Sequence, residues 1–289
     1  MATAHLTLRD IDLFTALGRC PLTVRQIRAL SVTFPSGFGS DRRLQDRLAI
    51  LAKAGLLHRF RYASMEGTGQ YYYTLSPESY RVLHGQDAPL PSQGMFREIG
   101  VARQHHTQRL SDFLVHTFIA AHRDGVELAD FHRENALKLS IGEEHLYPDS
   151  MLTLRVPDRP VFSFYAELDN STEPLTSPRE HDSWVRKLRF YEALADRSDH
   201  RFRVLGLITK SESRLRNLLA LAAAQARNPK RSIFYAVYLP DYLSHPSPLR
   251  ASLFTDHREL RVSLLPETRP VVASDVKAAS HTLVDPVAA

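Results

Sequence analysis

Apolar residues recur at helical spacing three times in the first 55 residues, each time behind a residue that can cap a helix. The three sets are Thr7 with Ile11, Phe14 and Leu17; Thr23 with Ile27 and Leu30; and Ser40 with Leu44, Leu48 and Leu51. Ser and Thr side chains accept hydrogen bonds from the first backbone amides of a helix, and apolar residues three or four apart form one face. The pattern predicts three short helices, the third ending at Gly55.

Two strand-like segments follow, residues 56–62 and 70–75, separated by a glycine-containing turn at Ser64–Gly69. They predict a β-hairpin. Helix, helix, basic helix and hairpin is the order of a winged helix-turn-helix, whose third helix enters the major groove of DNA. The residues expected to contact DNA are Arg42, Arg43, Arg47, Lys53 and Arg59. The same fold also serves protein contacts or dimerisation, and the pattern leaves both readings open.

A loop-forming stretch between Gly85 and Gly94 has no periodic apolar pattern. We therefore expect four segments: a winged-helix domain (1–85), a linker (86–94), a second domain (95–265) and an extended tail (266–289). The second domain begins with a long helix whose apolar face should pack on a sheet. That face comprises Leu110, Phe113, Leu114 and Phe118.

The second domain alternates helices with strands. The predicted order is helix, three strands, helix and strand, followed by a further helix and strand. The ranges are Met95–His122, 126–132, two strands ending near Val156 and Leu168, Pro178–Ala195, 201–209, 211–226 and 233–239. This predicts the α/β (α+β) class. The first six elements have the αβββαβ order of the restriction-endonuclease-like fold, an order that would serve many α/β proteins equally well.

Acidic residues mark the ends of two predicted strands. Asp149 follows Pro148 inside an apolar run, where a lone carboxylate is costly unless it is paired or bound to metal. Glu167 and Asp169 are two positions apart, so both face the same side of their strand. Mg²⁺ prefers oxygen ligands. Asp149 and Glu167 are therefore the candidate ligands for Mg²⁺ or Mn²⁺, and Asp169 is expected to assist or to bind a second ion.

The following helix carries Lys187 and, one turn later, Tyr191. This order of acids and lysine is that of the PD-(D/E)xK nucleases, with one departure. The lysine usually sits two positions after the second acid, where this chain has Asp169. Lys187 is the candidate replacement, because a lysine there can stabilise the charge that builds up on phosphorus. The candidate catalytic residues are Asp149, Glu167, Asp169, Lys187 and Tyr191.

Three further residues are weaker candidates. Glu134 would supply an additional acid for the metal, although a surface loop is the simpler interpretation. His105 and His106 would be metal ligands or substrate contacts, although a polar start of the long helix explains them equally simply. The sequence contains no Walker A motif, no G-x-S-x-G elbow and no H-E-x-x-H motif, which excludes the enzyme classes that those motifs define.

Charge and composition indicate which binding partners the protein can have. The formal charge is +5, and residues 1–85 hold 11 Lys and Arg against 6 Asp and Glu, while the rest of the chain is balanced. This local excess favours a polyanion-binding surface in the first domain. The single cysteine, Cys20, excludes an internal disulfide framework and a cysteine-based zinc cluster. Because no apolar run is long enough to span a membrane, we expect a soluble, cytoplasmic protein without membrane contacts.

Residues from about Leu6 to Leu239 resemble the replication-relaxation family of plasmid and mobile-element proteins. The residues that carry the resemblance are His105 or His106, Pro148-Asp149-Ser150, Glu167 to Thr172, and Lys187 to Tyr191. The resemblance implies a role in plasmid replication and DNA relaxation, with a divergent PD-(D/E)xK domain. The partners expected are double-stranded DNA, a second copy of the chain and replication proteins. An active Mg²⁺-dependent nuclease and a non-cleaving replication or transcription factor are both left open.

Overall fold

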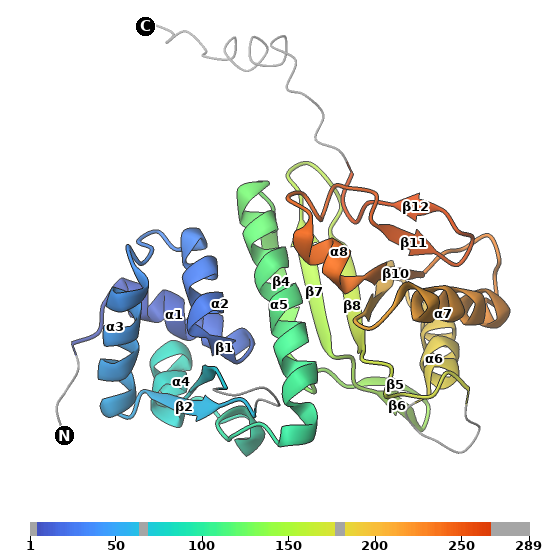
Figure 1. Cartoon of the computed structure of the whole chain (residues 1–289). Helices are drawn as coiled ribbons and strands as arrows, with labels where there is room; N and C mark the ends of the chain where they lie inside the picture. The colour runs from blue at the N-terminus through green and yellow to red at the C-terminus, as the bar shows by residue number, and fades with distance from the viewer. Residues whose placement is uncertain (1–4, 64–68, 177–182, 267–289) are drawn as a thin grey trace, which may run out of the picture.

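The structure is a computed structural model that describes residues 5–63, 69–176 and 183–266. Two regions lie on either side of one long helix, α5 (Figure 1). The N-terminal region contains a three-stranded sheet, and the other contains a seven-stranded sheet covered by helices. The mixed α/β class predicted from the sequence is confirmed. Within the described ranges, no helix combines the length and apolar character needed to cross a bilayer.

The three N-terminal helices begin directly after the predicted caps. They are α1 (Leu8–Arg19), α2 (Val24–Leu30) and α3 (Asp41–Lys53). The side chain of Thr23 accepts a hydrogen bond from the backbone N–H of Gln26, and that of Ser40 accepts one from Arg43. Gly55 follows α3 with a φ of 76°, a conformation that favours glycine. Capping and one buried apolar face therefore define each helix.

The small sheet is antiparallel and has the order β1–β3–β2. Its strands are β1 (Leu22–Thr23), β2 (Leu57–Arg61) and β3 (Tyr71–Leu75). The helix α4 (Pro77–His84) follows, starts after the capping residue Ser76 and packs against α1. The predicted hairpin is present as β2 and β3, while most of the turn predicted at Ser64–Gly69 lies outside the described residues.

The central helix α5 (Val101–Arg123) packs on both regions. Its predicted apolar face is buried, and the helix contacts β4 and β8 of the large sheet. On its other side, Gln26 on α2 donates a hydrogen bond to Asp112 at 2.8 Å, and Ser111 donates one to the carbonyl of Pro21 at 2.9 Å. One hydrophobic cluster consequently extends from α1 through α5 to the large sheet.

The large sheet has the order β12–β11–β10–β9–β8–β7–β4. Its strands are β4 (Glu127–His132), β7 (Ser150–Arg155), β8 (Phe162–Asp169), β9 (Phe202–Ile208), β10 (Phe234–Tyr238), β11 (Phe254–Asp256) and β12 (Arg261–Val262). Strands β4, β7 and β8 pair antiparallel, β8 to β10 pair parallel, and β10 to β12 pair antiparallel. Parallel neighbours need crossover connections, which α6 (Trp184–Arg197) and α7 (Glu212–Gln225) provide.

Alternate residues of the sheet face two different layers. In β9, Leu205 and Leu207 join the core shared with α5, whereas Val204 and Ile208 join a second core beneath α6 and α7. The same alternation in β8 directs Glu167 toward α6. The acidic residues of β8 that face α6 and α7 can therefore pair with side chains of those two helices.

Several short elements were not predicted. These are β1, α4, the hairpin of β5 (Leu139–Ile141) and β6 (Glu144–Leu146), α8 (Leu239–Ser244), β11 and β12. Elements of two to eight residues carry little periodic signal. The long helix was predicted to begin at Met95 but begins at Val101. Met95 is instead the last residue of a short 3₁₀ turn. The predicted helix start at Pro178 and the predicted tail beyond Pro266 lie outside the described residues.

Arg47 provides a test of the N-terminal packing. Its Nε lies 2.8 Å from Oδ1 of Asp10 and a terminal nitrogen lies 2.5 Å from Oδ2, while Asp10 is only 1% exposed. We expect Arg47→Ala to lower the free energy of unfolding by about 3 kcal/mol, because it leaves a buried carboxylate without its cation. Urea denaturation followed by circular dichroism measures the change.

The matched control is Arg42→Ala on the same helix, whose side chain is 89% exposed. It should change stability by less than about 0.5 kcal/mol. Equal stabilities of the two variants would show that the Arg47–Asp10 pair does not stabilise the fold.

Candidate metal centre

Asp149 lies at the end of the large sheet where β7 begins. Its Oδ2 accepts a hydrogen bond from the backbone N–H of Leu168 at 2.7 Å, which fixes the carboxylate against β8. Its Oδ1 lies 3.1 Å from Nε2 of His106 on α5. Burial raises the pKa of Asp149, but the hydrogen bond and charge of His106, the charge of Lys187 and the hydrogen bond from Leu168 together outweigh burial and hold the pKa below its ordinary value. Asp149 is therefore a charged carboxylate held between α5 and the sheet.

His106, Glu134 and Asp149 form a compact group of potential ligands. One nitrogen or oxygen atom of each lies within 4.8 Å of those of the other two. Glu134 comes from the turn after β4; its Oε1 lies 3.8 Å from Nε2 of His106 and is ion-paired with Arg103. Imidazole nitrogen and carboxylate oxygen are both ligands that divalent metal ions take in proteins. The donor set therefore fits a divalent cation.

Glu167 is fully buried beside this group, on the α6 side of β8. Its Oε1 accepts a hydrogen bond from the hydroxyl of Tyr191 at 2.5 Å, and its Oε2 lies 3.0 Å from Nζ of Lys187. Burial raises the pKa of Glu167 to about 7, and the charge of Asp149 adds to this rise while Lys187 opposes it. Both oxygens of Glu167 are thus held by side chains of α6.

Lys187 reaches the site from the first turn of α6. Besides Glu167, its Nζ lies 3.0 Å and 2.9 Å from the two carboxylate oxygens of Glu173. Burial lowers the pKa of Lys187, but the negative charges of Glu167, Asp149 and Glu173 outweigh it and raise the pKa well above its ordinary value. The lysine is therefore a fixed positive charge at neutral pH.

Asp169 has a different environment from Glu167. Its Oδ2 lies 2.6 Å from Nε of Arg214 on α7, and its Oδ1 accepts a hydrogen bond from the backbone N–H of Ser171 at 2.9 Å. The carboxylate is completely buried. Two acids on one side of a strand require cations nearby, and the structure supplies Lys187 for Glu167 and Arg214 for Asp169.

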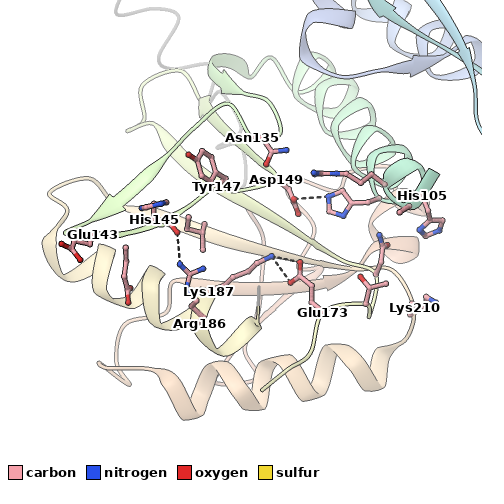
Figure 2. A pocket seen from close by; sticks show the side chains of 17 residues that line it. His105, Asn135, Glu143, His145, Tyr147, Asp149, Glu173, Arg186, Lys187 and Lys210 are labelled. Carbon is pink, nitrogen blue, oxygen red and sulfur yellow. Dashed lines mark hydrogen bonds and ion pairs between the residues drawn. The ribbon is translucent and has the colours of Figure 1, made fainter. Parts of the chain in front are cut away.

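A cavity of about 950 Å³ opens beside Asp149 (Figure 2). Positive side chains reach it from α5, from α6 and from the segment after β9. These side chains are Arg103, Arg186, Lys187 and Lys210. His105 also lines the cavity, but burial lowers its pKa. A cavity that joins carboxylates to several cations suits a metal ion together with an anionic ligand.

The structure brings four of the five predicted catalytic residues into one network. Asp149 and Lys187 line the cavity, Glu167 lies behind Lys187, and Tyr191 holds Glu167 in place. Asp169 points to α7 and does not line the cavity.

The residues predicted to contact DNA lie far along the chain from this cavity, on α3 and β2. The exposed ones are Arg42, Arg43, Lys53 and Arg59. The guanidinium of Arg59 lies over the ring of Tyr71, with 4.6 Å between its central carbon and the ring centroid. Arg47 turns inward instead and is ion-paired with Asp10.

Sequence reasoning gave too little weight to some residues and missed others. Glu134 is not a plain loop acid, because its side chain is only 17% exposed and faces His106. Glu173 and Arg214, the partners of Lys187 and Asp169, were not considered. An indirect signal existed for Arg214 alone: two buried acids on one strand face require basic partners, but this arginine could not be placed without knowing how the helices cross the sheet.

Comparison with known proteins concerns the whole chain. No curated protein and no solved structure matches the chain significantly. A family model described as Replication-relaxation matches residues 19–210, about two thirds of the chain. The matched segment runs from the end of α1 to the residues after β9 and contains Asp149, Glu167 and Lys187. The chain belongs to the Replication-relaxation family.

Proposed function

We propose that this protein binds DNA during replication or relaxation of a plasmid or mobile element, and that it cleaves or nicks DNA with a divalent metal ion. One observation carries the proposal: Asp149 and His106 share a cavity with the fixed charge of Lys187 and further cations, and an oxygen of Glu134 lies within 4.8 Å of their donor atoms. Metal-assisted phosphodiester hydrolysis needs these parts, namely ligands for the cation and positive groups for the substrate.

The arrangement of elements supports the proposal. Helix α5, antiparallel strands β4, β7 and β8, helix α6 and parallel strand β9 follow one another as expected for a restriction-endonuclease-like core, with the β5–β6 hairpin inserted after β4. Asp149 precedes the second of these three strands and Glu167 lies near the end of the third. Both positions are those expected for the acids of a PD-(D/E)xK site.

The chemistry follows from the charges of the site. A bound divalent ion would supply a Lewis acid and lower the pKa of a bound water. Lys187 stabilises the negative charge that develops on the phosphate oxygens, because its ammonium is buried and already positioned. Tyr191 and Glu167 keep Lys187 in position. The cations at the cavity mouth, including Lys210, bind the phosphates that flank the reacting one.

We also propose that the N-terminal region is a winged helix that binds duplex DNA. Three helices followed by the β2–β3 hairpin support this assignment, with α3 as the helix presented to the major groove. Its outward face carries Arg42 and Arg43 beside the capping residue Ser40. Because Arg47 is ion-paired with Asp10, the residues that contact DNA are the exposed basic ones.

A double variant tests this surface. We expect Arg42→Ala/Arg43→Ala to weaken duplex binding about tenfold in 0.1 M salt, and to make the slope of log K against log salt shallower by about 1 to 2. The reason is that each lost phosphate contact removes one counterion-release event. Fluorescence anisotropy with a labelled duplex at several salt concentrations measures both quantities.

The matched control is Arg155→Ala/Arg216→Ala, which removes the same charge from two exposed arginines of the other region. It should preserve the salt slope. Equal losses in both double variants would show that α3 is not the element that contacts DNA.

A second candidate is a replication, copy-control or transcription factor that binds DNA without cutting it. Two observations favour it: Asp169 stands where the usual lysine would be, and Lys187 is engaged by Glu167 and Glu173. A lysine held by two carboxylates delivers less positive charge to a substrate than an unpaired one.

Supercoiled plasmid separates the two candidates. The nuclease should convert it to nicked or linear DNA with Mg²⁺ or Mn²⁺, and EDTA should stop the reaction. If the plasmid stays intact with either ion under conditions where the protein binds it, the nuclease is excluded and the binding factor is retained.

A further inference from the structure

We propose that the metal ion is held by His106, Glu134 and Asp149, that Glu167 stays outside the coordination shell, and that the site therefore prefers Mn²⁺ to Mg²⁺. The inference specifies the metal site of the proposed nuclease, and it replaces the carboxylate pair Asp149 and Glu167 expected from the sequence. It concerns binding, so it can hold or fail whether or not the protein cuts DNA.

The ligand group draws on three separate elements. His106 lies on α5, Glu134 in the turn after β4 and Asp149 at the start of β7. Nε2 of His106 lies 3.1 Å from Asp149 Oδ1 and 3.8 Å from Glu134 Oε1, so the nitrogen faces both carboxylates. At ligand distances of about 2.0–2.2 Å, two ligands of one ion lie at most about 4.4 Å apart. The three donor atoms lie within 4.8 Å of one another, so small side-chain shifts let them share one ion.

Glu167 is already bound on both of its oxygens. Tyr191 donates to Oε1 at 2.5 Å, and the ammonium of Lys187 lies 3.0 Å from Oε2. The residue is also completely buried. To join a metal ion, Glu167 would have to leave an internal lysine without this partner, which is strongly unfavourable.

A metal ion can bind His106, Glu134 and Asp149 without breaking a buried ion pair. Glu134 is ion-paired with Arg103, whose side chain is 58% exposed and lines the cavity. A divalent ion that binds Oε1 of Glu134 competes only with this solvated guanidinium, because arginine can return to water. The displaced Arg103 then lies at the cavity wall, where it can meet a substrate phosphate.

The donor types set the preference among ions. Mg²⁺ favours oxygen ligands and keeps several waters, whereas imidazole nitrogen suits first-row transition ions. One imidazole with two carboxylates is therefore a better site for Mn²⁺ than for Mg²⁺. The two ions are suitable probes: Mn²⁺ is paramagnetic and gives an electron paramagnetic resonance signal, whereas Mg²⁺ gives none and can be used as a competitor.

Pulsed electron paramagnetic resonance tests the inference on the full chain. Bound Mn²⁺ should show modulation from a directly coordinated ¹⁴N nucleus, and His106→Gln should remove it. Asp149→Asn and Glu134→Gln should each weaken Mn²⁺ binding by about tenfold or more, whereas Glu167→Gln should leave the affinity nearly unchanged. Mg²⁺ should displace Mn²⁺ only at concentrations about ten times higher or more.

The neighbouring variant His105→Gln is the matched control and should keep the nitrogen signal, since His105 also lines the cavity but lies outside the ligand group. The nitrogen signal of the wild-type protein tests the proposed ligand set even if one of the variants fails to fold. Absence of Mn²⁺ binding, Mn²⁺ bound without nitrogen, or a loss in Glu167→Gln equal to that in Asp149→Asn would overturn the inference. A nitrogen-bound Mn²⁺ in a protein that leaves DNA intact would keep the metal site and remove only the nuclease.

Discussion

We expect Asp149→Asn to reduce metal-dependent plasmid cleavage by about 1,000-fold or more, while duplex binding by the N-terminal region stays unchanged. Asparagine retains an oxygen that can accept the hydrogen bond of the Leu168 amide, so the strand geometry is preserved. It removes the negative charge that faces His106 and the candidate metal position. A loss of this size corresponds to about 4 kcal/mol of transition-state stabilisation. Initial rates on supercoiled plasmid with Mn²⁺ measure it.

A control for this variant comes from the same cavity. Glu144→Gln also removes one carboxylate from the lining, but Glu144 is exposed and lies outside the ligand group. It should keep most of the activity. If Asp149→Asn cleaves as fast as Glu144→Gln, then Asp149 does not hold the ion, and any cleavage seen comes from elsewhere.

Much of the fold could be predicted because its signals are local. The caps Thr7, Thr23 and Ser40 each act within one helical turn, and the apolar face of α5 repeats over many turns. Strands β4, β7, β8, β9 and β10 of the large sheet are visible in the sequence as short apolar runs, which are also local signals. The strands β11 and β12 have two or three residues each, too few for a period to be recognised.

The site could be predicted only in part, because its partners come from different layers. Asp149 and Glu167 could be predicted as site residues, because burying a carboxylate inside an apolar run costs free energy unless it is paired or bound to metal. For Glu134 the sequence left a metal ligand and a surface loop both open, because its position depends on the turn after β4 meeting α5 next to His106. The same limit applies to Arg47, whose ion pair with Asp10, 37 positions away in the chain, could not be predicted from the sequence.

The Lys187–Glu167 pair gives the largest expected effect on stability. We expect Lys187→Met to lower the free energy of unfolding at pH 8 by about 3 to 5 kcal/mol, because it leaves Glu167 fully buried without its cation. Methionine fills a similar volume, so the loss reports charge more than packing. The double variant Lys187→Met/Glu167→Gln should recover part of it, with a coupling of about 2 kcal/mol in the cycle.

The destabilisation of Lys187→Met should shrink as the pH falls from 8 to 5. Burial raises the pKa of Glu167 and also that of Glu173, and Lys187 opposes both rises. Without the lysine, the folded protein binds more protons than the unfolded chain in this range, so its stability falls as pH rises. Urea unfolding of the wild type and the three variants of the cycle at both pH values measures this. A loss that is independent of pH and persists in the double variant would show that Lys187 contributes through packing instead of pairing with Glu167.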